Sequence, residues 1–269
     1  MSEHNNAASR PVRVRDLQAM KAKGQKICVL TAYDAPMAHL LDRAGIDVIL
    51  VGDSLGMVVL GYETTIPVTL DMMIHHTQAV SRGARRPLIV ADMPFLTYQI
   101  SVEEAVRNAG RLVQEGGASA VKLEGGRHVL HVVERLAEVG IPVMGHLGLT
   151  PQSIHALSGF RMQARDEASA EQLLSDARAL EKAGAFSLVL ESIPAAVARE
   201  VTSSVQIPTI GIGAGPHCDG QVLVSSDMFG ILDRPAPSFA RQYAHVHEIL
   251  IEAARAYIED VRGGRFPGS

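Results

Sequence analysis

The chain has 269 residues, 47% of them hydrophobic and 20% charged, so it can form one large α/β domain or two smaller ones. A net charge of −4, scattered Lys and Arg residues and an aromatic content of 4% without Trp argue against a nucleic-acid partner. Residues 1–10 carry no apolar signal core and no apolar stretch reaches the roughly 18 residues that cross a bilayer, so we expect no membrane association.

Along the chain, apolar runs alternate with amphipathic segments. Eight runs rich in Val, Ile and Leu are typical of strands buried on both faces of a parallel sheet. These predicted strands cover residues 27–34, 46–53, 87–92, 118–124, 141–146, 186–191, 207–213 and 221–227. Helices are predicted at 13–23, 35–45, 70–83 and 101–115, in a segment ending at Val139, at 168–183, after Pro194, and at 238–261. Residues 54–67 show no lasting periodicity and are predicted to be a long functional loop.

Eight strands with mostly helical connections are the count of a (β/α)8 TIM barrel. An open, doubly wound sheet is the alternative, but it gives no reason for eight strands in order. The link at 213–220 is too short for a full helix, so we expect a reduced helix before the eighth strand. We therefore expect a single TIM-barrel domain over residues 1–269, with residues 1–10 flexible.

Three carboxylates follow neighbouring predicted strands. Asp53, Asp92 and Glu124 end the second, third and fourth strands, and the carboxyl ends of barrel strands meet at one mouth. A single Asp at such a place is more often a helix N-cap. Three like charges raise one another's pKa, a conflict that a divalent cation removes, and oxygen ligands favour magnesium. We therefore expect a metal site here, with Ser54 as either an N-cap or a donor to a bound carboxylate.

Three further side chains belong to this mouth. Lys122 lies two residues before Glu124, on the same face of the strand, as a catalytic group or as an ion pair that fills the barrel. Glu191 ends the sixth strand across the mouth, where it is expected to be a general base; a salt bridge to Arg161 is the alternative. His146, at the end of the fifth strand, is expected to bind substrate, with a structural core histidine as the alternative.

Together these segments resemble the ketopantoate hydroxymethyltransferase family (3-methyl-2-oxobutanoate hydroxymethyltransferases) of pantothenate biosynthesis. The matching stretches span about residues 30 to 230 and read TAYD, LVGDSLGMVVLGYETTIPVT, ADMPF, VKLEGG, GHLGLTPQS, QLLSDARALEKAGA, LVLESIP and IGIGAG followed by DGQVLV. The resemblance implies a TIM barrel of the phosphoenolpyruvate-mutase/isocitrate-lyase type, a homo-oligomer expected to be a homodecamer, and Mg²⁺. It also implies transfer of the one-carbon unit of 5,10-methylenetetrahydrofolate to 3-methyl-2-oxobutanoate, giving 2-dehydropantoate.

The resemblance further implies roles for particular residues. Asp53, Asp92 and Glu124 would belong to the metal site, and Glu191 would be the proton acceptor. The keto acid would contact Asp53, Ser54, Asp92 and Lys122.

Two rival functions remain open. One is a magnesium-dependent C–C lyase of the isocitrate-lyase type acting on a 2-oxo acid, which would use a reactive cysteine in a mouth loop. The other is a barrel that only binds a metabolite. Cys28 and Cys218 have neither metal-ligand spacing nor a disulfide framework, which favours a reducing, cytoplasmic setting.

Overall fold

The computed structural model describes residues 10–268, which divide into two compact units at Val222. The organisation as a single domain stays a prediction. Residues 1–10 were expected to be flexible; of these, residues 1–9 lie outside the described part of the chain. None of the helices in that part combines the length and hydropathy that a membrane crossing requires.

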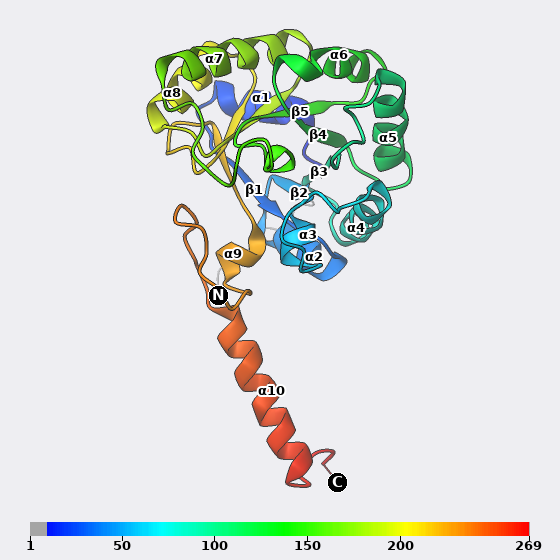
Figure 1. Ribbon diagram of the computed structural model, residues 1–269. Helices are drawn as coiled ribbons and strands as arrows, with labels where there is room; N and C mark the ends of the chain where they lie inside the picture. Colours follow the sequence, from blue (N-terminus) through cyan, green and yellow to red (C-terminus); the bar gives the residue numbers. More distant parts are fainter. Residues whose placement is uncertain (1–9, 269) are drawn as a thin grey trace. The chain divides into compact units, whose positions relative to one another are not determined.

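The first unit is built on a closed barrel of eight strands that neighbour one another in chain order, as the sequence predicted. Figure 1 shows the ring of strands with α4, α5, α6 and α7 outside it. The strands are β1 (Ile27–Thr31), β2 (Val48–Val51), β3 (Leu88–Asp92), β4 (Ala120–Glu124), β5 (Val143–Gly148), β6 (Ser187–Glu191), β7 (Thr209–Ile212) and β8 (Gly220–Leu223).

Helices connect most of the strands. They are α1 (Val14–Ala22), α2 (Ala35–Ala44), α3 (Leu55–Val58), α4 (Leu70–Gly83), α5 (Val102–Gln114), α6 (Leu130–Glu138), α7 (Glu167–Lys182) and α8 (Ala195–Ser204), with 3₁₀ turns η1 (Arg127–Val129) and η2 (Pro151–Ser153). Local signals set their ends: Asp34 accepts the backbone N–H of Met37 at 2.7 Å to begin α2, and Gly45 ends it with φ 86°. The described residues 213–219, between β7 and β8, contain no helix, which confirms the reduced connection.

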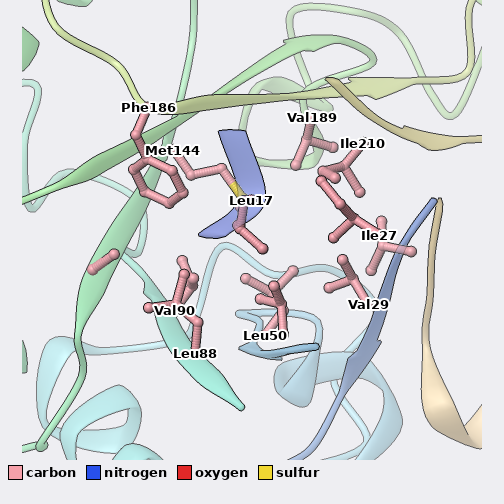
Figure 2. Packing of buried hydrophobic residues seen from close by; sticks show 13 residues of the cluster. Leu17, Ile27, Val29, Leu50, Leu88, Val90, Met144, Phe186, Val189 and Ile210 are labelled. Carbon is pink, nitrogen blue, oxygen red and sulfur yellow. The ribbon is translucent and has the colours of Figure 1, made fainter. Parts of the chain in front are cut away.

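The barrel interior changes from apolar at the strand starts to charged at the strand ends. In β3, Leu88 and Val90 share a face with Asp92, and in β4 Ala120 shares a face with Lys122 and with Glu124. Figure 2 shows apolar side chains from several strands gathered around the side chain of Leu17 from α1. Because this layer fills the start of the barrel, the polar side chains that follow are confined to the other end.

The second unit contains α9 (Ser225–Phe229) and α10 (Val246–Arg262). Two expectations are wrong here. The eighth strand does not run to residue 227, because α9 begins at Ser225. The last helix begins eight residues later than residue 238, because backbone bonds tie the preceding segment to α9: Tyr243 N–H donates to Met228 O at 2.8 Å and His247 N–H to Gly230 O at 2.9 Å.

Lys21 of α1 joins the N-terminal helix to the barrel. Its Nζ lies 3.0 Å from Asp219 Oδ2 and donates at 2.9–3.0 Å to three backbone carbonyls, those of Thr202, Val205 and Ile207. We expect Lys21→Met to lower the free energy of unfolding by about 2–3 kcal/mol, because these acceptors would lose their donor. Urea unfolding measures this, with the exposed Lys23→Met as control. Equal stability of the two variants would contradict the prediction.

Candidate active site

Strand register brings the predicted polar residues together. Asp92 pairs with Lys122 across β3 and β4, and Glu124 pairs with His146 across β4 and β5. Glu191 is opposite Gly148 across β5 and β6. The side chains of Asp53, Asp92, Lys122, Glu124 and His146 are all buried. The predicted strand ends therefore form one charged cluster at the carboxyl end of the barrel.

Asp53 and Asp92 form one side of this cluster. The backbone N–H of Asp53 donates to Asp92 Oδ2 at 3.0 Å. A Cβ atom at Gly52 would lie 2.7 Å from Ser54 Oγ, so any larger residue there would displace the Ser54 hydroxyl. Ser54 takes the N-cap position of the short helix α3, while its hydroxyl lies 2.9 Å from Tyr33 Oη. Ser54 thus occupies the N-cap position without a capping hydrogen bond from its side chain, and its role as a donor to a bound carboxylate stays a prediction.

Lys122 is the positive centre of the cluster. Its Nζ lies 3.1 Å from Asp92 Oδ1 and 3.2 Å from His146 Nδ1. Burial disfavours the ammonium ion, yet the carboxylates of Asp92, Glu124 and Asp53 outweigh it and hold the pKa of Lys122 above its ordinary value. Lys122 therefore stays charged, in an ion pair with Asp92 and as a donor to His146.

His146 connects Lys122 with Glu191. It is the fourth of six residues in β5 rather than the last, a correction of the predicted strand end. Lysine has only donors, so Nδ1 accepts from Lys122 and Nε2 carries the ring hydrogen. This Nε2 lies 3.2 Å from Glu191 Oε2. Burial, with Lys122 next in effect, lowers the pKa of His146, which keeps the ring neutral. Among the described residues, Glu191 thus pairs with His146 and not with Arg161.

The cluster carries more negative than positive charge. Burial, reinforced by Asp92, raises the pKa of Asp53 to about 7, and burial raises the pKa of Glu124 well above its ordinary value. Within residues 10–268, no three His, Cys, Asp or Glu side chains are grouped as a ready-made metal site. Magnesium, however, commonly takes one or two protein carboxylates and completes its shell with substrate and water. The pair Asp53 and Asp92 fits this pattern, since both are buried carboxylates and Asp92 Oδ1, apart from its ion pair with Lys122, has no hydrogen-bond donor among the described residues.

Two buried residues at the site were not predicted. Gln152, in the turn η2 after β5, donates from Nε2 to Asp53 Oδ2 at 2.9 Å. Tyr98, after β3, lies with its hydroxyl 2.7 Å from Gln152 Oε1. Gln152 lies in the stretch GHLGLTPQS, whose resemblance to the family could have marked it as a site residue. Nothing in the sequence around Tyr98 distinguishes that residue.

Comparison with known proteins agrees with this geometry. The family model described as ketopantoate hydroxymethyltransferase matches residues 11–269. Two similar proteins, each called 3-methyl-2-oxobutanoate hydroxymethyltransferase, come from Moorella thermoacetica and Syntrophus aciditrophicus. The first is 58% identical and covers 95% of this chain and 95% of the relative. The second is 56% identical and covers 96% of this chain and 95% of the relative.

Solved structures support the fold. A 2,3-dimethylmalate lyase, described as a member of the PEP mutase/isocitrate lyase superfamily, matches with a TM-score of 0.60 at 16% identity, covering 95% of this chain and 89% of that chain. The phosphoenolpyruvate phosphomutase of Streptomyces platensis subsp. rosaceus matches with a TM-score of 0.62 at 12% identity, covering 93% and 88%. These likenesses confirm the expected TIM-barrel fold. Because the family model covers nearly the whole chain and the relatives share more than half of its residues, the chain belongs to the ketopantoate hydroxymethyltransferase family.

Proposed function

We propose that this enzyme transfers the hydroxymethyl unit of 5,10-methylenetetrahydrofolate to 3-methyl-2-oxobutanoate, giving 2-dehydropantoate in pantothenate biosynthesis. The match of residues 11–269 to the family carries this proposal. The buried cluster of Asp53, Asp92, Lys122, His146 and Glu191 supports it, because the reaction needs a base and a means of holding negative charge.

Asp53 and Asp92 are the residues that would hold a magnesium ion, with Glu124 beside them. When bound, the ion would supply Lewis-acid polarisation of the keto and carboxylate oxygens of the substrate. The oxygen-only donor set favours a divalent cation, and so do the burial and the neighbouring Asp92 carboxylate that together raise the pKa of Asp53 to about 7. Ser54, next to Asp53, would donate to the substrate carboxylate.

Glu191 is the proton acceptor in this scheme. It lies at the end of β6, its side chain is 15% exposed, and so it can reach a substrate in the mouth. His146 Nε2 lies 3.2 Å from its carboxylate and would help to hold it near C3 of the keto acid. Glu191 takes the C3 proton, and the electron pair left at C3 forms the new C–C bond to the one-carbon unit of the folate. Both bonds from that carbon to the folate nitrogens break, water supplies the hydroxyl group, and the nitrogens keep the bonding electrons and take up the C3 proton and the second hydrogen of the water, which leaves tetrahydrofolate.

Lys122 stabilises the charge that develops during proton removal. Negative charge moves from C3 to the keto oxygen, and a fixed ammonium group in a buried site acts strongly on such charge. The ion pair with Asp92 and the contact with His146 hold the ammonium group in place, so little reorganisation is needed when the charge forms.

The test is formation of 2-dehydropantoate from the keto acid and methylenetetrahydrofolate. A lyase of the isocitrate-lyase type would instead cleave a C–C bond without folate. The positions of the cysteines disfavour that rival: Cys28 is at the start of β1 and Cys218 lies two residues before the start of β8, away from the carboxyl ends of the strands. Product formation that does not depend on folate would overturn the proposal.

The affinity for divalent cations should depend on pH. A carboxylate must lose its proton to bind a metal, and Asp53 in the metal-free protein has a pKa of about 7. Below pH 7 a proton on Asp53 competes with the metal ion. The affinity for the metal should therefore increase with pH, by up to about tenfold per pH unit, and level off above pH 8. Titration with Mn²⁺ at pH 6, 7 and 8 measures this. An affinity that is the same at all three values would contradict the raised pKa of Asp53.

We also propose self-association, up to the expected homodecamer. All residues of α10 are exposed or half-buried, and its exposed side chains include Ile249, Leu250, Tyr257 and Ile258. An apolar helix of this kind is typical of an interface. Sedimentation velocity measures the assembly directly. The cytoplasmic location stays a prediction.

A further inference from the structure

The side-chain amide of Gln152 is buried and uses all of its hydrogen-bonding capacity. Nε2 donates to Asp53 Oδ2 and to the backbone oxygen of Met93, both at 2.9 Å. Oε1 accepts from Tyr98 Oη at 2.7 Å and from Gln99 Nε2 at 3.4 Å. The backbone oxygen of Met93 can only accept, so Nε2 rather than Oε1 must face it, and the amide has only one compatible orientation. Its hydrogen therefore always points at the Asp53 carboxylate.

The backbone of Gln152 holds a second acid. Its N–H donates to Glu124 Oε2 at 3.0 Å. Asp53 follows β2 and Glu124 ends β4, so one residue from the turn after β5 fixes carboxylates that come from two separate strands.

Tyr98 holds Gln152 in turn. The backbone N–H of Glu124 donates to the Tyr98 hydroxyl at 3.1 Å, and this hydroxyl donates to Gln152 Oε1. Burial, with Glu124 next in effect, raises the pKa of Tyr98 well above its ordinary value, so the hydroxyl keeps its hydrogen. A fully satisfied buried network of this kind has one preferred arrangement.

We propose that Gln152 is a positioning residue, which presents Asp53 and Glu124 in the geometry that binds the divalent cation, and that Tyr98 locks it in this role. The inference rests on the proposed function for its metal, yet it concerns binding of the ion rather than turnover. Groups that hydrogen-bond metal-binding carboxylates typically change metal affinity by 10–100-fold when they are removed.

The experiment is Mn²⁺ binding to Gln152→Met, followed by electron paramagnetic resonance without keto acid or folate. Methionine keeps the length of the side chain and removes both the donor to Asp53 and the acceptor for Tyr98. We expect the affinity to fall by about 10–100-fold while the protein remains folded. The control is Thr77→Val, which loses a buried hydrogen bond to Met73 O in α4, outside the barrel, and should bind Mn²⁺ like the wild type.

Tyr98→Phe is the second variant. It keeps the packed ring and removes only the hydroxyl that fixes Gln152, so it should weaken Mn²⁺ binding in the same direction by a smaller factor. Weaker binding in both Gln152→Met and Tyr98→Phe supports the inference, and weaker binding in Tyr98→Phe alone supports it if Gln152→Met does not fold. Wild-type affinity in any folded variant of either residue overturns it. Failure of the wild type to make 2-dehydropantoate while the affinities change as expected would overturn the proposed function and leave this inference standing.

Discussion

Replacing Glu191 with Gln is expected to lower kcat/KM for hydroxymethyl transfer by a factor of about 10²–10⁴, the contribution of a positioned base. Gln has the same shape and can still contact His146, 3.2 Å away in the wild type, so keto-acid and metal binding should persist. Exchange of the C3 proton of the bound keto acid with deuterium should be lost with the activity. Steady-state kinetics and NMR measure the two effects.

Glu200→Gln is the matched control for this substitution, because Glu200 lies exposed on α8. It should leave activity and exchange unchanged. Deuterium exchange that continues at the wild-type rate in Glu191→Gln would remove Glu191 from the role of base.

Replacing Lys122 with Met should have two large effects. Removal of the ammonium leaves Asp92 without its ion-pair partner at 3.1 Å, which is expected to cost about 3–5 kcal/mol of stability. Loss of a fixed charge aimed at developing negative charge should lower kcat by a further factor of about 10²–10³. Thermal unfolding and kinetics at saturating substrate separate the two effects.

The control for Lys122 is Lys26→Met, since Lys26 lies just before β1 and donates to a backbone oxygen at the other end of the barrel. It should retain activity. A stable Lys122→Met variant with wild-type kcat would show that Lys122 only fills the barrel.

The barrel and much of its site could be predicted because the strands are short and apolar, and five of the apolar runs in the sequence end in a charged or polar residue that belongs to the site. In a strand, every second residue faces the same side. The alternation that buries Val90 and Ala120 therefore also places Asp92 and Lys122 on the inner face, so one residue pattern predicts both the strands and the site. Register then follows from closure of the barrel, and it brings Glu124 beside His146.

Features set by contacts distant in sequence could not be predicted. The apolar spacing of Phe239 and Tyr243 continues the pattern of α10, but a backbone bond to Met228 holds Tyr243 outside the helix. Gln152 has a polar side chain in a loop, and its role depends on Asp53, 99 residues earlier in the chain. Periodicity carries no information about such pairings.

The most direct test of the account is deuterium exchange at C3 of 3-methyl-2-oxobutanoate by the wild-type protein without folate. With Mg²⁺ present, Glu191 should remove the proton and exchange should proceed although no product forms. Chelation should stop the exchange, and added Mg²⁺ should restore it, because Asp53 and Asp92 would then hold the ion beside the keto acid. Exchange at the same rate in the chelated, metal-free protein would contradict the account.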